Sequence, residues 1–135
     1  MTDPGFANRM RDLMKYKPDF TINDVQLLKL GRYFQLAPET RFIVGRNEEE
    51  NGKLLKLTRE GDLCFYPVKT KGPVGIGRGA FNKDYIFTAS SIIARYSDGD
   101  PGQQLEVAYK SVPSDRTDFI TAMPIKESNL ALLRI

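Results

Sequence analysis

The sequence predicts an α+β fold, with a mostly antiparallel sheet packed against two or three helices. Runs with strand propensity alternate irregularly with helical patterns, so hairpins outnumber strand–helix–strand units. At 135 residues, the chain has enough apolar surface for one compact core. Its hydrophobic fraction of 41% is ordinary for a globular domain. These observations together predict a single folded unit.

The first thirty residues are expected to be helical. Apolar residues recur at three- and four-residue spacing between residues 6 and 14, and Pro18 ends that helix soon afterwards. A second short helix follows and ends at Gly31. We therefore predict a helical N-terminal linker at residues 1–30 and a single α+β domain at residues 31–135.

The strands are expected in two groups. Residues 32–36 and 41–44 are rich in β-forming side chains and flank a turn-like segment, so they predict a hairpin. Further runs of the same kind are found at residues 63–68, 105–109 and 119–123. A glycine-punctuated stretch at residues 72–79, which follows the run at 63–68, is expected to add a strand or a hairpin segment.

Two helices inside the domain have clear start signals. Asn47 can cap the first, and three glutamates follow where they favour the positive end of the helix dipole. The third of them, Glu50, has the spacing of a capping box. The second helix is expected to begin at Asn82 or Asp84 and to run to about Ser97.

The composition excludes several kinds of chemistry. The chain has no histidine and a single cysteine, Cys64, so it cannot form Ser–His or Cys–His nucleophile pairs, and it lacks the usual zinc ligands. We therefore expect no catalytic residue, no metal ion and no cofactor. No apolar run approaches the length of a membrane span, and one cysteine suits a reducing compartment. The expected location is the cytoplasm.

Positive charge is clustered between residues 69 and 79. The charged residues there are Lys69, Lys71 and Arg78, with no acid among them, although the net charge is only +3. Such clusters are typical of proteins that bind polyanions. The glycines of residues 72–79 would let backbone amides approach a phosphate, but they equally fit a tight hairpin or bulge.

A second candidate site is the strand-to-helix junction at Arg46. A helix N-terminus offers free amides to an anion, and Arg46 stands beside one. The glutamates that follow favour the alternative interpretation of a capped structural helix. Tyr66 and Tyr96 could stack on unpaired bases if their rings are exposed, although most aromatic residues in strands belong to the core.

Four short motifs occur in order over about fifty residues. They are GRNEEEN at residues 45–51, GDLCF at 61–65, GP at 72–73 and ARYS at 94–97. This string resembles the RNA-binding domain of the NFACT proteins, the ribosome quality-control family. It is more similar still to a variant found at the C-terminus of bacterial PP-loop ATPases, which are relatives of tRNA thiouridine synthases.

The resemblance implies an NFACT RNA-binding-domain-like fold and a role in binding RNA, with tRNA as the expected partner. It also implies an upstream PP-loop ATPase domain in a longer protein of the tRNA-thiolation type. The family usually carries a histidine near Tyr66, and the variant often has one in place of Tyr33, so roles of those histidines do not carry over. From motif and charge together, the candidate RNA-binding residues are Arg46, Asn47, Asn51, Tyr66, Lys69, Lys71, Gly72, Arg78, Arg95 and Tyr96.

Two other functions fit the sequence. Cys64 could relay a persulfide for an attached PP-loop domain, which would require an accessible thiol of low pKa. Alternatively, the chain could be a protein-docking or oligomerisation domain that holds its parent protein together. In all three hypotheses the isolated chain is not an enzyme.

Overall fold

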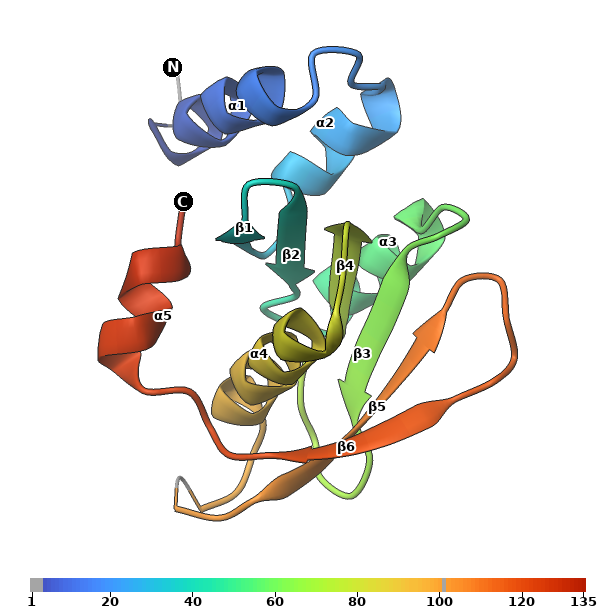
Figure 1. The fold of residues 1–135 in the computed structure, drawn as a ribbon, viewed down its shortest axis with the longest axis vertical. Coiled ribbons are helices and arrows are strands. Elements are labelled where there is room, and N and C mark those ends of the chain that lie inside the picture. Colours follow the sequence, from blue (N-terminus) through green and yellow to red (C-terminus); the bar gives the residue numbers. More distant parts are fainter. Residues whose placement is uncertain (1–3, 101) are drawn as a thin grey trace.

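The computed structural model describes residues 4–100 and 102–135. Among these residues it has five helices and a six-stranded sheet in which every neighbouring pair is antiparallel, which confirms the predicted α+β class (Figure 1). The elements, in chain order, are α1 (Pro4–Tyr16), α2 (Ile22–Leu28), β1 (Arg32–Ala37), β2 (Thr40–Val44), α3 (Glu48–Leu57), β3 (Leu63–Pro67), β4 (Gly75–Gly79), α4 (Lys83–Tyr96), β5 (Leu105–Ser111), β6 (Asp118–Ala122) and α5 (Glu127–Leu133).

The strand order of the sheet is β1-β2-β4-β3-β5-β6. β1 and β2 form the predicted hairpin, and β4 lies between β2 and β3, in the middle of the sheet. Two glycines of β4 are required there by packing. A Cβ at Gly75 would overlap the ring of Phe42, and a Cβ at Gly77 would overlap the ring of Phe81. These two glycines therefore admit aromatic rings to a central strand and do not form a phosphate-binding loop.

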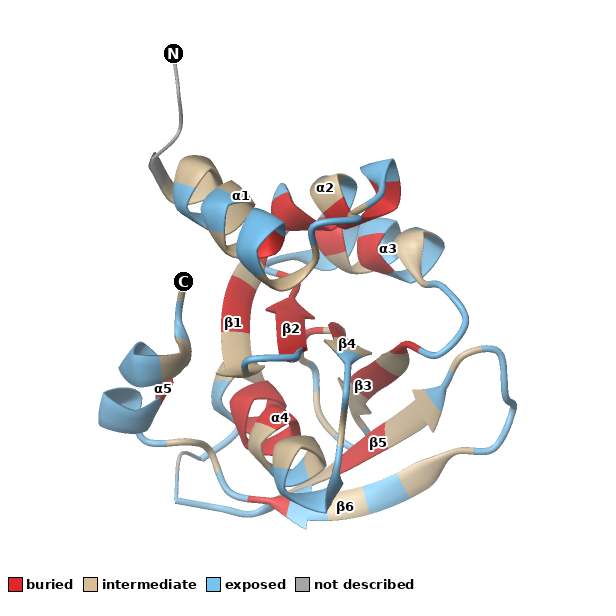
Figure 2. Ribbon diagram, turned by 45° about the horizontal axis from the view of Figure 1, so that its top comes forward, coloured by how far each residue is buried: buried red, intermediate tan, exposed pale blue. Residues whose placement is uncertain are grey.

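The sheet has a buried cluster on each face (Figure 2). One cluster joins strand residues such as Phe34 and Phe65 to α4 and to Leu130 of α5. The other joins Leu13, Leu27 and further residues of the first three helices to the opposite face. Burying each of these large side chains contributes about 1.5–3 kcal/mol. The helices of residues 4–28 thus share a core with the sheet, and the division of the chain at residue 31 stays a prediction.

Side chains before three of the helices cap them. Thr21 accepts a hydrogen bond from the backbone N–H of Asp24, whose carboxylate accepts from Thr21 in return, so α2 begins with a capping box. Asn47 caps α3, and Asn82 caps α4 by accepting the backbone N–H of Tyr85 at 2.9 Å. The predicted start at Asn47 is confirmed, and of the two starts predicted for α4, Asn82 and Asp84, the helix uses Asn82.

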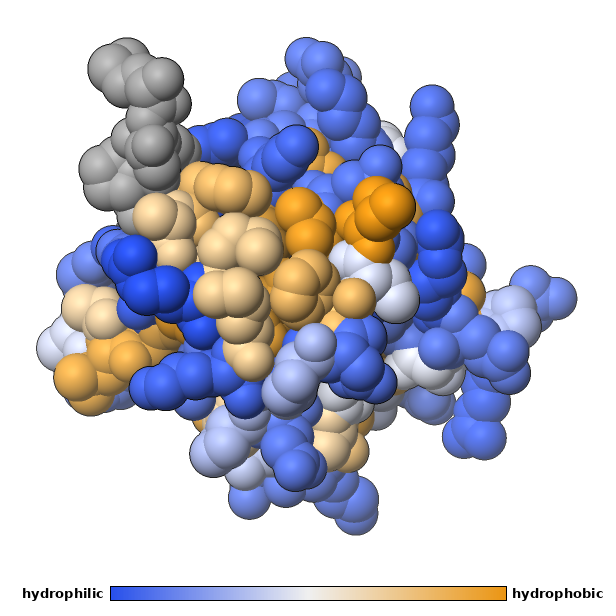
Figure 3. Space-filling model, turned by 90° about the horizontal axis from the view of Figure 1, so that it is seen from above, coloured by the Kyte–Doolittle hydropathy of each residue, from blue (hydrophilic) through white to orange (hydrophobic). Residues whose placement is uncertain are grey.

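Apolar side chains gather on the outer face of α1 and α2 (Figure 3). Met14 and Ile22 are 50% and 78% exposed there. None of the described helices has the length and apolar character needed to cross a bilayer. A polar cleft lies elsewhere on the molecule, where β2 leads into α3.

Candidate functional site

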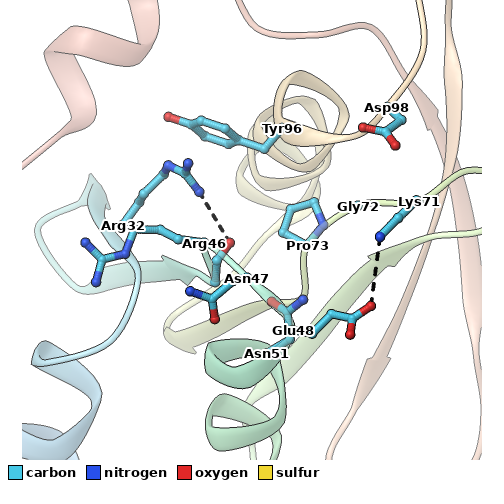
Figure 4. A pocket seen from close by; sticks show the side chains of 11 residues that line it. Arg32, Arg46, Asn47, Glu48, Asn51, Lys71, Gly72, Pro73, Tyr96 and Asp98 are labelled. Atoms are coloured by element: carbon cyan, nitrogen blue, oxygen red, sulfur yellow. Dashed lines mark hydrogen bonds and ion pairs between the residues drawn. The ribbon is translucent and has the colours of Figure 1, made fainter.

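A cleft of about 460 Å³ opens between the start of α3, the end of α4 and the loop that joins β3 to β4 (Figure 4). Six of the predicted RNA-binding residues line it, although they come from three separate segments of the chain: Arg46, Asn47, Asn51, Lys71, Gly72 and Tyr96. Five further residues complete its wall, namely Arg32, Gly45, Glu48, Pro73 and Asp98.

Arg46 is held at the cleft by the carboxylate of Glu50. Oε1 of Glu50 accepts the backbone N–H and Nε of Arg46, each at 2.9 Å, and Oε2 accepts Nη2 of Arg46 at 2.7 Å. Oε2 also accepts the backbone N–H of Gly31 at 3.1 Å. The hydrogen bonds from Arg46 outweigh burial and lower the pKa of Glu50 to about 2. The carboxylate is therefore ionised at neutral pH, and the Arg46 side chain is oriented while remaining 54% exposed.

This arrangement corrects the predicted capping box. Asn47 does cap α3, because its Oδ1 accepts the backbone N–H of Glu50 at 2.9 Å. The Glu50 side chain, however, bonds to Arg46 and Gly31 rather than to the backbone N–H of Asn47. The sequence spacing alone could not reveal Gly31 as a partner, because it lies nineteen residues away, in the turn between α2 and β1.

Asn47 and Asn51 present their amide NH2 groups as donors. The oxygen of Asn47 is used by the helix cap, and Oδ1 of Asn51 accepts the backbone N–H of Val74 at 3.1 Å. A Cβ at Gly45 would overlap this Asn51 oxygen, so glycine permits the close approach. Because a backbone donor fixes the oxygen in each amide, the NH2 group is the part that can serve a ligand.

Arg32 is a site residue that the sequence reasoning missed. Its guanidinium carbon lies 4.1 Å from the centroid of the Tyr96 ring, and its Nη1 donates to the carbonyl oxygen of Gly45 at 3.3 Å (Figure 4). The Tyr96 hydroxyl accepts Nη2 of Arg134 at 3.3 Å. A usable signal was the hairpin register, because Arg32 pairs with Val44 and is thereby brought beside the junction at Gly45.

The loop between β3 and β4 closes the cleft on the remaining side. The backbone N–H of Asp98 donates to the carbonyl oxygen of Lys71 at 2.7 Å, and the Thr70 hydroxyl donates to the carbonyl oxygen of Asp98, also at 2.7 Å. A Cβ at Gly72 would overlap the side chain of Ser97, so this position requires glycine. The loop backbone is thus attached to the end of α4, while Lys71 extends outward.

The cleft has mixed charge with an excess of donors. Three cationic side chains line it, those of Arg32, Arg46 and Lys71, against the carboxylates of Glu48 and Asp98. The Lys71 ammonium and the Glu48 carboxylate are 4.0 Å apart and both strongly exposed, so solvent screens their attraction. Elsewhere in the described residues, no three His, Cys, Asp or Glu side chains are grouped to hold a metal ion.

Arg78 does not belong to the cleft, which corrects its predicted role in phosphate binding. Its side chain is only 12% exposed, and its N–H groups make five hydrogen bonds to protein acceptors. Asp62 accepts two of them, at 2.9 and 2.6 Å, and Asp24 accepts another at 3.0 Å. Burial lowers the pKa of Arg78, but the hydrogen bonds and charges of Asp62 and Asp24 outweigh it, so the pKa is raised. Arg78 is a structural cation.

The other predicted residues lie outside the cleft lining. Lys69 is exposed on the same loop as Lys71. Tyr66 is half-buried in β3 and packs against the buried cluster under α1–α3. Arg95 of α4 donates to the Glu127 carboxylate of α5 at 2.6 Å and to the carbonyl oxygen of Ile125 at 3.2 Å.

Cys64 lies inside the sheet. It is 2% exposed, and burial raises the pKa of its thiol. A persulfide relay requires the opposite setting, which is an accessible thiol of lowered pKa. The structure therefore offers no support for the sulfur-relay hypothesis.

Comparison with known proteins identifies the family. The family model described as the NFACT protein RNA binding domain matches residues 31–132. The chain belongs to the NFACT RNA-binding domain family. No curated protein matches it. In this NFACT domain, Gly45 and Gly72 of the quoted motifs lie where the backbone comes close to the side chains of Asn51 and Ser97.

Among solved structures, the NFACT domain is similar to the C-terminal part of the fibronectin/fibrinogen-binding protein from Streptococcus suis. The TM-score is 0.70 and the sequence identity 14%, so the likeness concerns the fold. The alignment covers 100% of this chain and 62% of the other, so the chain spans less than two thirds of that structure's length.

Proposed function

We propose that this RNA-binding domain binds tRNA, and that the cleft at the β2–α3 junction is its binding face. The observation that carries the proposal is the convergence of Arg32, Arg46 and Lys71 beside two oriented amide donors. Most hydrogen bonds to folded nucleic acid go to phosphate and sugar oxygens, which are acceptors. A donor-rich cleft in a domain of this family suits that ligand.

The proposal predicts strong salt dependence. Three phosphate contacts would release counterions, and the affinity should fall by about 40-fold between 50 and 200 mM salt. A titration of the chain against bulk tRNA at several salt concentrations, followed by fluorescence anisotropy, measures this slope. Binding that does not respond to salt, or no binding at low salt, would contradict the proposal.

The binding face is located by removing charge that supports no other structure. The double variant Lys69→Ala with Lys71→Ala removes two exposed cations of the β3–β4 loop, and Arg46 is left in place because Glu50 depends on it. We expect weaker binding and a salt slope shallower by at least the contact, about one, that Lys71 makes in the cleft.

The matched control is Lys83→Ala with Lys126→Ala. These lysines are also exposed, and Lys83 lies at the opposite end of α4 from Tyr96. Both double variants carry the same net charge, so an equal loss of affinity in the two would mean nonspecific attraction and would count against the cleft.

We further propose that the domain delivers tRNA to an upstream PP-loop ATPase domain of a tRNA-thiolation protein. The support is the resemblance of residues 45–97 to the variant attached to such enzymes. The proposal predicts that tRNA competes with labelled tRNA better than an equal mass of duplex RNA without loops does. Equal competition by the two RNAs would limit the function to general RNA binding.

A further inference from the structure

A flat cationic surface is built into the cleft wall. The Arg32 guanidinium is held from two directions, by the Tyr96 ring at 4.1 Å on one face and by the carbonyl oxygen of Gly45 at 3.3 Å along one edge. Guanidinium planes and aromatic rings are the groups on which proteins stack unpaired bases. Because both partners fix its orientation, the Arg32 plane requires little ordering when a ligand arrives.

Further hydrogen-bond donors and cations line the same cleft as this plane. Asn47 and Asn51 offer NH2 groups, and Arg46 and Lys71 supply exposed positive charge. Figure 4 shows Arg46, Asn47 and Asn51 across the cleft from Tyr96, and Lys71 at the far end, directed toward Glu48. Phosphate contacts and a stacking plane therefore lie within one small cleft.

The size of the cleft favours a single nucleotide. Its volume of about 460 Å³ falls in the range of about 300–1,000 Å³ that holds small ligands, whereas a helix of paired RNA presents its bases edge-on within the grooves. A base that is paired and stacked in a duplex could not reach the Arg32 plane. The ligand must offer a base that has already left its helix.

We infer that the cleft captures one unpaired nucleotide of the RNA. Its base stacks on the Arg32 guanidinium, which the Tyr96 ring supports from behind, and its phosphate is held by Arg46 and Lys71. The inference rests on the proposed RNA-binding function and adds that the site selects unpaired over duplex RNA. Arg32 is then a specificity-determining residue. Its planarity, and not only its charge, is what the site uses.

The variant that tests this inference is Arg32→Lys, which keeps the charge and removes the plane. The ligands are a labelled single-stranded RNA heptamer and the same strand paired with its complement, measured by anisotropy at several salt concentrations. For the wild-type chain, we expect tighter binding to the single strand. For Arg32→Lys, we expect about tenfold weaker binding to the single strand with an unchanged salt slope.

A second pair of variants tests the ring behind the plane. Tyr96→Phe keeps the ring and loses the hydroxyl that accepts Arg134, so we expect nearly wild-type binding. Tyr96→Leu removes the ring and should weaken single-strand binding as Arg32→Lys does. Circular dichroism and urea unfolding of each variant separate a local effect from a loss of fold.

The outcomes distinguish this inference from the function beneath it. If the wild-type chain binds RNA but prefers the duplex, or if Arg32→Lys binds the single strand as tightly as the wild type, the inference is overturned and RNA binding stands. If the wild-type chain binds neither RNA nor tRNA at low salt, the proposed function fails and the inference fails with it.

Discussion

Two arginines of this domain have opposite surroundings in the sequence and in the folded chain. Arg78 lies in a basic, glycine-punctuated segment, and Arg46 lies beside a run of three glutamates. Charge alone would assign Arg78 to the ligand and Arg46 to the scaffold. The structure buries Arg78 among carboxylates and leaves the Arg46 side chain 54% exposed at a cleft.

The difference arises from where the acids come from. The acids of Arg78 are distant in sequence, with Asp24 fifty-four residues away and Asp62 sixteen. The acid of Arg46 is Glu50, four residues on, and it occupies one side of the guanidinium while the other side faces the cleft. A cation whose partners are local can be oriented without being enclosed, whereas one shared by several elements is enclosed by them.

The largest effect should come from Arg78→Met. The change leaves the carboxylates of Asp24 and Asp62, whose side chains are 3% and 4% exposed, without their shared partner. Breaking a buried ion pair in this way costs about 3–5 kcal/mol, a large share of the stability of a small domain. Urea unfolding followed by circular dichroism measures the change in the free energy of unfolding.

One result would overturn the assignment of Arg78 as a structural cation. If Arg78→Met unfolded at the wild-type urea concentration and lost tRNA affinity, Arg78 would be a ligand contact after all. The variant Arg78→Lys, which keeps charge but cannot make five hydrogen bonds, should fall between the wild type and Arg78→Met.

A smaller effect is expected from Glu50→Gln. The folded-state pKa of Glu50 is about 2, below its ordinary value of 4.5, so its ionised form adds stability above pH 4.5 that is lost as the pH falls toward 2. We expect Glu50→Gln to cost about 1–3 kcal/mol at pH 7. Urea unfolding at a series of pH values should show the wild type and Glu50→Gln converging near pH 2, and a constant difference would contradict the assignment.

The features that were predictable from the sequence depend on neighbours in the chain. The caps at Asn47 and Asn82 and the first hairpin follow from residues within a few positions of one another. The family motifs also contain most of the residues that line the cleft. Gly45 and Gly72 are among them, and close contacts require glycine at both positions.

The features that were not predictable depend on the strand order. The insertion of β4 between β2 and β3 carries Arg78 toward α2, and the β1–β2 register brings Arg32 to the cleft. The Arg78 contacts join segments far apart in the chain and leave no local signal, whereas the register of the predicted hairpin was a usable signal for Arg32 that charge and motifs did not draw on. This is why Arg78 was assigned to the ligand and Arg32 was missed.

The smallest effect on stability should come from Lys71→Ala, which is the cleft's counterpart to Arg78→Met. The Lys71 side chain is 79% exposed, and its nearest acid, Glu48, is 4.0 Å away and 89% exposed. Exposed substitutions of this kind usually change the free energy of unfolding by less than about 0.5 kcal/mol. Urea unfolding should therefore superpose on the wild type, while the tRNA salt slope becomes shallower by about one contact. If Lys71→Ala instead destabilised the fold and left the salt slope unchanged, this exposed lysine would stabilise the fold rather than bind RNA. Exposure would then not distinguish the structural cations from those that face the ligand.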